Sequence, residues 1–247
     1  MSIVFKILKR LLIATITLFC IGVIVFFVWR INSGNTPASL KALTPNDSLA
    51  AAYAEEGNDL YMFFQPRQLE YTANEGANGY FFVSDTAIIP AANQIQTVVR
   101  YNNSTLKEVA KDYSLPEIPA RDSDIFEYYV VIAIDLTPEN KEDNLSSDSD
   151  KVKLVHCKGT VTGEDEKYMY NFRRVVFDLN ECDVDLGTLV SDGTLIAIYM
   201  DYFYVGAEDS ETPLANLCLY DYLNDNERVK LSGKDKKFLR AFAYVND

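Results

Sequence analysis

The pattern of hydrophobic positions begins with an unbroken apolar stretch from Leu11 to Trp29, nineteen residues without a charged side chain. At about 1.5 Å per helical residue this stretch spans roughly 28 Å, close to the hydrocarbon thickness of a bilayer. Thr15 and Thr17 fit such a helix because their hydroxyls can donate to carbonyls of the preceding turn. Trp29 ends the stretch, where an indole favours the lipid–water boundary. The pattern therefore predicts a transmembrane helix at 11–29.

A cleaved signal peptide is the alternative interpretation of this stretch. The apolar region of a signal peptide has about 7–15 residues, and a small-x-small cleavage site follows it closely. Here the stretch is longer, and the first Ala-x-Ala pattern begins far downstream at Ala50. These two differences favour an anchor that stays attached to the chain.

The charges that flank the stretch predict its orientation. Lys6, Lys9 and Arg10 precede it, whereas Arg30 alone follows it closely. Because positive residues are retained on the cytoplasmic side, the N-terminus is expected in the cytoplasm and the C-terminal part outside the cell membrane. The expected regions are a cytoplasmic N-terminus (1–10), a transmembrane anchor (11–29), a stalk with a possible short helix (30–58) and an extracellular domain (59–247).

Beyond the stalk, the hydrophobic pattern is that of β-strands. Runs rich in Tyr, Phe, Ile and Val recur with the length of strands, and some alternate between apolar and polar positions. The runs lie at 59–72, 79–89, 94–101, 126–136, 152–162, 167–179, 195–205 and 214–223. Because their spacing is too short for crossover helices, we expect antiparallel pairing. The predicted fold is mainly β, an antiparallel β-sandwich that is Ig-like or related, with two or three short helices.

Local signals within this pattern lead to further predictions. Ser104 is expected to cap a short helix, and Ser232 to begin another helix near the C-terminus. The apolar alternation slips its phase at Arg173 and Arg174, which predicts a bulge or a strand that leaves the sheet. Residues 137–150 are polar and acidic, and we expect them to form a disordered loop.

The charge of the chain narrows the classes of partner. The net charge is −13, and four of the 23 basic residues lie in the first thirty positions, which contain no acidic residue. The remaining 19 basic and 36 acidic residues give the rest of the chain a net charge of −17. A field of this sign repels nucleic acid, so no nucleic-acid partner is expected. The expected partners are membrane lipid around 11–29 and a protein or cell-envelope component.

The cysteines are too few for a disulfide scaffold. Cys20 lies in the apolar stretch, and the three others are Cys157, Cys182 and Cys218. One disulfide with a free thiol is compatible with this number, and so is none. Spacings of 25 and 36 residues match no zinc signature, so no zinc site is predicted.

Two short patterns resemble parts of a catalytic or metal-binding site, but each lacks residues that such a site needs. His156, the one histidine of the sequence, neighbours Cys157, yet adjacent strand residues point to opposite faces and cannot form a Cys–His pair. Asp183-x-Asp185-x-Gly187 resembles a fragment of a calcium loop, but the other ligands and the closing Glu are missing. The sequence therefore assigns no catalytic, cofactor-binding or metal-binding residue.

Glu127 and Asp201 are the acids most embedded in apolar strands, and they are the candidates for a hydrolytic carboxylate pair. The alternative is an outward position or an ion pair with Arg100, Arg173 or Arg174. The strands are also rich in tyrosine, which either forms an exposed binding surface or packs in the core. These tyrosines are Tyr128, Tyr129, Tyr168, Tyr170, Tyr199, Tyr202, Tyr204, Tyr220 and Tyr222.

Several segments resemble single-pass membrane proteins of clostridial bacteria. They are the basic start, Val28-Trp29-Arg30, the stretch RYNNST at 100–105, the stretch LCLY at 217–220 and the stretch LSGKDKK at 231–237. The resemblance extends over most of the chain and implies a Gram-positive cell surface. It implies no activity, so no functional residue is carried over from it.

The favoured function is therefore a membrane-anchored, extracytoplasmic binding module. The sequence has no G-x-S-x-G, H-E-x-x-H, P-loop, C-x-x-C or G-x-G-x-x-G motif, which makes an enzyme the less favoured class. A carboxylate-based cell-envelope hydrolase is one alternative. An accessory subunit of a membrane complex is the other, although the single glycine of the anchor gives no G-x-x-x-G face for helix pairing.

Overall fold

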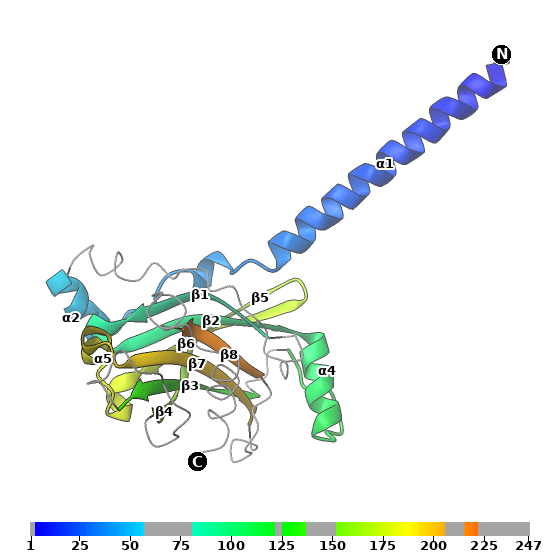
Figure 1. Ribbon diagram of the computed structural model, residues 1–247. Helices are drawn as coiled ribbons and strands as arrows, with labels where there is room; N and C mark the ends of the chain where they lie inside the picture. Colours follow the sequence, from blue (N-terminus) through cyan, green and yellow to red (C-terminus); the bar gives the residue numbers. More distant parts are fainter. Residues whose placement is uncertain (1–2, 57–80, 122–124, 137–151, 206–214, 222–247) are drawn as a thin grey trace.

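The computed structural model describes residues 3–56, 81–121, 125–136, 152–205 and 215–221. Its first element, α1 (Ile3–Ser33), is a continuous helix that projects from the β-rich part of the chain (Figure 1). As expected, the hydroxyls of Thr15 and Thr17 donate to backbone carbonyls four residues earlier, at 3.0 and 2.9 Å. α1 is long and apolar enough to cross a membrane, and a signal sequence near the N-terminus would share these properties.

Within the described ranges, short helices and eight strands follow α1. The helices are η1 (Ala38–Leu40), α2 (Asp47–Glu56), η2 (Pro90–Ala92), α4 (Asn103–Asp112), η4 (Leu179–Cys182) and α5 (Leu186–Asp192). The strands are β1 (Phe82–Ile89), β2 (Gln94–Asn102), β3 (Phe126–Asp135), β4 (Val152–Lys158), β5 (Thr160–Lys167), β6 (Tyr170–Asp178), β7 (Leu195–Tyr204) and β8 (Ala215–Asp221). The run predicted at 59–72, the loop at 137–150 and the helix that begins at Ser232 lie outside the described residues.

The strands form two four-stranded sheets in which every neighbouring pair is antiparallel. Sheet A has the order β1-β2-β6-β5, and sheet B has the order β4-β3-β7-β8. The chain is thus an apolar N-terminal helix followed by antiparallel sheets, and the mainly β prediction is confirmed at that level.

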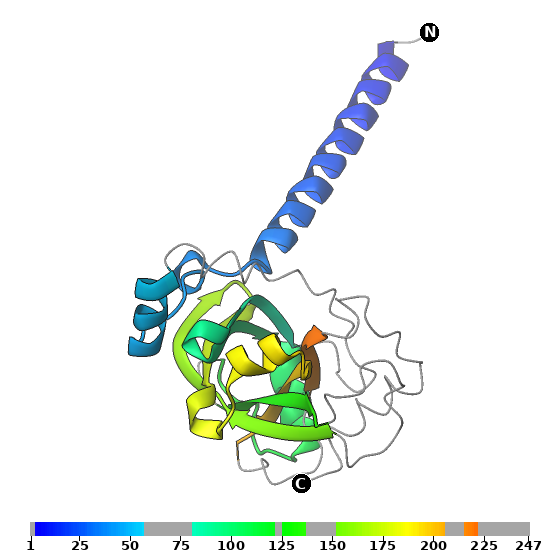
Figure 2. The same ribbon diagram turned by 60° about the vertical axis from the view of Figure 1, so that its left-hand side comes forward.

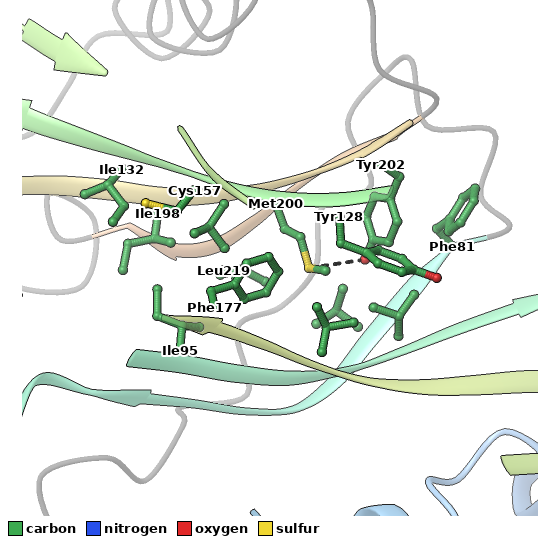
Figure 3. Packing of buried hydrophobic residues seen from close by; sticks show 14 of the residues in the cluster. Phe81, Ile95, Tyr128, Ile132, Cys157, Phe177, Ile198, Met200, Tyr202 and Leu219 are labelled. Carbon is green, nitrogen blue, oxygen red and sulfur yellow. Dashed lines mark hydrogen bonds between the residues drawn. The ribbon is translucent and has the colours of Figure 1, made fainter. Parts of the chain in front are cut away.

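Both sheets contribute to the largest hydrophobic cluster (Figure 3). Its members from sheet A include Ile95 and Phe177, and those from sheet B include Ile132, Ile198 and Met200, all of them fully buried. Burial of side chains of this size stabilises a fold by about 1.5–3 kcal/mol each relative to exposure. The two sheets are therefore held together by one shared core.

The chain passes from sheet B to sheet A at Gly159, between β4 and β5. Its N–H donates to the carbonyl oxygen of Tyr128 at 2.7 Å, which holds the corner against β3. A Cβ at this position would lie 2.4 Å from Cε1 of Phe177 and 2.6 Å from Cγ1 of Val175. Both neighbours are fully buried, so the close approach of the two sheets requires glycine here.

The chain that follows α1 lies on the outer face of sheet A and runs past β5 to α2 (Figure 2). Gln96 of β2 accepts from the N–H of Thr44 at 2.8 Å and donates to its carbonyl oxygen at 3.0 Å. Arg174 of β6 donates to the carbonyl oxygen of Leu40. These bonds satisfy buried polar groups that would otherwise destabilise the sheet. The segment 34–49 is therefore folded against the domain, a packing that its composition did not predict.

One local prediction was wrong, and another was correct only in part. Asn102, and not Ser104, caps α4, because its side-chain oxygen accepts from the N–H groups of Ser104 and Thr105 at 2.8 and 3.3 Å. At Arg173 and Arg174, β6 pairs with β2 without a register shift, but its pairing with β5 shifts register between Val161 and Gly163, opposite Val175 and Arg174. The predicted bulge is therefore present at this place, but the extra residue lies in β5 and not in β6. The two arginines lie on opposite faces of β6 that are both covered, and this explains why the apolar alternation is lost there.

Candidate functional site

Three of the candidate residues, Glu127, Tyr129 and Asp201, lie together on the outer face of sheet B, with Lys158 and Phe203 beside them. Tyr129 of β3 lies opposite Lys158 of β4 and opposite Asp201 of β7. Glu127, two residues before Tyr129, lies opposite Phe203. Because side chains alternate along a strand, all five project from the same face. We call these five residues the Glu127 cluster.

Glu127 is the polar centre of this cluster. Lys158 Nζ lies 2.6 Å from Oε2 of Glu127, and the hydroxyl of Tyr129 donates to the same oxygen at 2.8 Å. The rings of Tyr129 and Phe203 meet edge to face at 5.6 Å between centroids, a favourable geometry for aromatic pairs. The cluster thus combines an ion pair with two half-buried rings.

The neighbours of Glu127 determine the protonation state of its carboxyl group. The hydrogen bond from Lys158 lowers the pKa of Glu127 below its ordinary value, burial opposes this effect, and the hydrogen bond from Tyr129 supports it. Glu127 is therefore ionised near neutral pH. The acid in glycosidic cleavage needs a raised pKa, so this site provides Glu127 as an anion and not as a proton donor.

Glu127 has the outward, half-exposed position that was one of the two alternatives left open by the sequence, and it is also ion-paired. Arg100, Arg173 and Arg174 were the partners named in the other alternative, but all three belong to sheet A and Glu127 belongs to sheet B. Sequence reasoning missed Lys158 as the partner. No local signal identifies Lys158, because its approach to Glu127 depends on the register between β3 and β4.

Asp201 occupies the middle of the same face, beside Tyr129, but its side chain is buried. The residue is 2% exposed, so bulk water and a dissolved substrate do not reach its carboxylate. Glu127 and Asp201 therefore share a face of one sheet without forming an open pair of carboxylates. The arrangement gives the hydrolase alternative no geometric support.

Cys157 and His156 point to opposite faces of β4, as the strand alternation requires. Cys157 is fully buried and forms a disulfide with Cys182 of η4, with a distance of 5.9 Å between the Cα atoms. His156 lies opposite Val131 on the outer face of sheet B. The disulfide removes the thiol as a nucleophile.

Asp185 of the calcium-like fragment and Glu164 of β5 make local contacts. Asp185 caps α5 by accepting from the N–H and the hydroxyl of Thr188 at 3.1 and 2.9 Å, and these bonds lower the pKa of Asp185. Glu164 lies 3.3 Å from Arg173. Within the described part of the chain, no group of three or more His, Cys, Asp or Glu side chains is arranged to hold a metal ion.

The tyrosines divide between core and surface. Tyr128 and Tyr202 are fully buried and lie 5.5 Å apart between ring centroids, so they fill the shared core (Figure 3). Tyr129 contributes to the Glu127 cluster, and Tyr168 lies at the surface beside Trp29. Tyr222 lies outside the described residues. The strand tyrosines therefore do not form one continuous aromatic surface in the described part of the chain.

Comparison with models of known protein families, with curated proteins and with solved structures finds no match. The resemblance to clostridial single-pass proteins stays a prediction.

Proposed function

We propose that this chain is a single-pass membrane protein whose extracytoplasmic β-sandwich binds a protein or a cell-envelope component through the Glu127 cluster. In this proposal residues 1–10 are cytoplasmic and residues 11–29 stay in the membrane as an anchor. The sandwich arrangement of the two sheets is supported by their shared hydrophobic core. The segment 34–49 belongs to the domain because it is hydrogen-bonded to sheet A.

The disulfide supports the proposed orientation. Disulfides form and persist in oxidising compartments and are rare in the reducing cytoplasm. Cys157 and Cys182 lie after the apolar helix, so the domain that contains them is expected on the outer side. The basic residues before the helix lead to the same orientation.

The observation that carries the binding function is the composition of the Glu127 cluster. Its two half-buried aromatic rings offer apolar area with few rotatable bonds, and the adjacent ion pair offers polar atoms in fixed positions. Binding hot spots combine these two properties. β3 and β4 also lie on the side of the domain away from α1 (Figure 1), where an anchored domain can reach a partner.

Photocrosslinking in intact cells tests the proposal. The full chain is expressed with a benzophenone amino acid in place of Phe203 and, as a matched control, in place of Glu117, which is exposed on the loop after α4. We expect a discrete adduct from position 203 that is lost when Tyr129→Ala is added. The absence of an adduct at 203, or the same adducts at both positions, would contradict the proposal.

A topology measurement tests the anchor separately. A C-terminal epitope on the full chain should be digested by protease added to intact protoplasts, while the N-terminus of the purified protein should still carry the residues before Leu11. A protected epitope would reverse the orientation. A mature N-terminus downstream of the apolar stretch would establish cleavage in place of anchoring.

A further inference from the structure

The β5–β6 hairpin lies at the point where α1 meets the domain (Figure 1). Its tip consists of Lys167, Tyr168, Met169 and Tyr170, with Lys167 paired to Tyr170 across the turn. The ring of Tyr168 meets the ring of Trp29, the last residue of the apolar stretch, at 5.3 Å between centroids. The tip is therefore level with the end of the proposed anchor.

The tip is apolar and exposed. Tyr168 is 55% exposed and Met169 is 44% exposed, although both side chains are large and carry no charge. Tyr168 has φ of 58°, the left-handed conformation that glycine adopts most easily at such a turn. The hairpin thus presents an aromatic ring at a position where a glycine would make the turn with less strain.

Three contacts fix the tip to its surroundings. Lys167 Nζ donates to the carbonyl oxygen of Asn32 in the last turn of α1 at 2.5 Å. Arg121 donates to the carbonyl oxygens of Tyr168 and Tyr170 at 2.9 and 3.1 Å. The hairpin is therefore held in a set position relative to the end of α1.

We infer that Tyr168 and Met169 insert into the lipid–water interface of the outer leaflet beside Trp29, an inference that rests on the proposed membrane anchor. Tyrosine and tryptophan both favour this depth because their rings are apolar and their polar groups stay hydrated. Two cations lie in the elements that meet here, Arg30 in the last turn of α1 and Lys167 in the tip itself, in a chain whose remainder is strongly acidic. These cations complement anionic lipid headgroups. An inserted tip beside the anchor would fix which side of the domain faces the membrane.

Tryptophan fluorescence can test this inference because Trp29 is the single tryptophan of the chain. The full-length double variant Trp29→Phe/Tyr168→Trp is reconstituted in vesicles of phosphatidylcholine and phosphatidylglycerol in equal parts. Some vesicles carry a nitroxide quencher near the headgroup, and others carry it near the end of the acyl chain. We expect blue-shifted emission from position 168 and stronger quenching by the shallow nitroxide. Trp29→Phe/Met169→Trp provides a second reporter with the same expected result.

The control places the reporter far from the anchor. Leu136 is 53% exposed and directly follows β3, whose C-terminal end lies on the side of the domain that carries α5 and away from α1 (Figure 1). Trp29→Phe/Leu136→Trp should show the emission of a hydrated indole and no lipid quenching. Equal quenching at 136 and 168, or none at 168 and 169, would overturn the inference.

The wild-type chain separates this inference from the proposed anchor. If lipid nitroxides quench Trp29 but not a tryptophan at 168 or 169, the anchor stands and the inserted hairpin is wrong. If Trp29 is not quenched and the chain leaves the membrane fraction, the anchor itself is wrong. Quenching at 168 that requires phosphatidylglycerol would support the role of Arg30 and Lys167.

Discussion

Removal of the disulfide between Cys157 and Cys182 should lower the free energy of unfolding by an amount that can be calculated from the length of the loop it closes. The disulfide joins β4 to η4 across a sequence separation of 25 residues, and it restricts the unfolded chain more than the folded one. The chain-entropy relation gives a stabilisation of about 3.5 kcal/mol for a loop of this size. We therefore expect the double variant Cys157→Ala/Cys182→Ala to lose about 3–4 kcal/mol of unfolding free energy.

The assay is urea unfolding of the full-length chain in detergent micelles, followed by the near-ultraviolet circular dichroism of the buried tyrosines. The midpoint of the double variant should fall, and a reductant added to the wild-type protein should lower its midpoint by a similar amount. Cys20→Ala is the matched control, because Cys20 is exposed on α1 and forms no disulfide. Its unfolding midpoint should equal that of the wild type.

Two results would refute this reasoning. One is a loss in the double variant of less than about 1 kcal/mol, well below the entropic expectation. The other is alkylation of Cys157 and Cys182 in the denatured, unreduced protein, which would mean that the bond does not form. The second result would also remove the disulfide as support for the proposed orientation.

Three further variants test individual contacts. Gly159→Ala should destabilise the fold by about 1–3 kcal/mol in the same unfolding assay, because its Cβ would lie 2.4 Å from the buried ring of Phe177. Lys158→Ala should raise the pKa of Glu127 toward its ordinary value of 4.5, as measured by carbon NMR of the carboxyl group, and should remove about 0.5 kcal/mol of stability. That stability is present above pH 4.5 and is lost as the pH falls through the lowered pKa of the folded state. Asp185→Ala should cost about 1 kcal/mol by removing the cap of α5, measured by urea unfolding.

Matched controls accompany these variants. Gly22→Ala should leave the domain unchanged, since nothing lies within 4 Å of the added Cβ. Lys153→Ala removes an exposed lysine of the same strand as Lys158 and should not change the pKa of Glu127. Asp185→Asn keeps a capping oxygen and should retain most of the stability. If each control behaved like its test variant, the specific contacts would not explain the effects.

The sequence alone determined the features that depend on local pattern. Nineteen uncharged residues predicted the apolar helix, because helix length and hydropathy are properties of consecutive positions. The runs around 94–101, 126–136 and 195–205 correspond to β2, β3 and β7, because Tyr, Val and Ile favour extended backbone. Short spacings also predicted antiparallel pairing, which the two sheets have.

Only the tertiary structure decided which distant residues meet. The partner of Glu127 is Lys158, the partner of Cys157 is Cys182, and the face of Gln96 is covered by the segment after α1. Each of these contacts depends on strand register and sheet order, and a shift of one residue would move every side chain to the other face. Sequence reasoning could therefore identify Glu127 and Asp201 as embedded acids, but it could not determine that one is ion-paired at the surface and the other is buried.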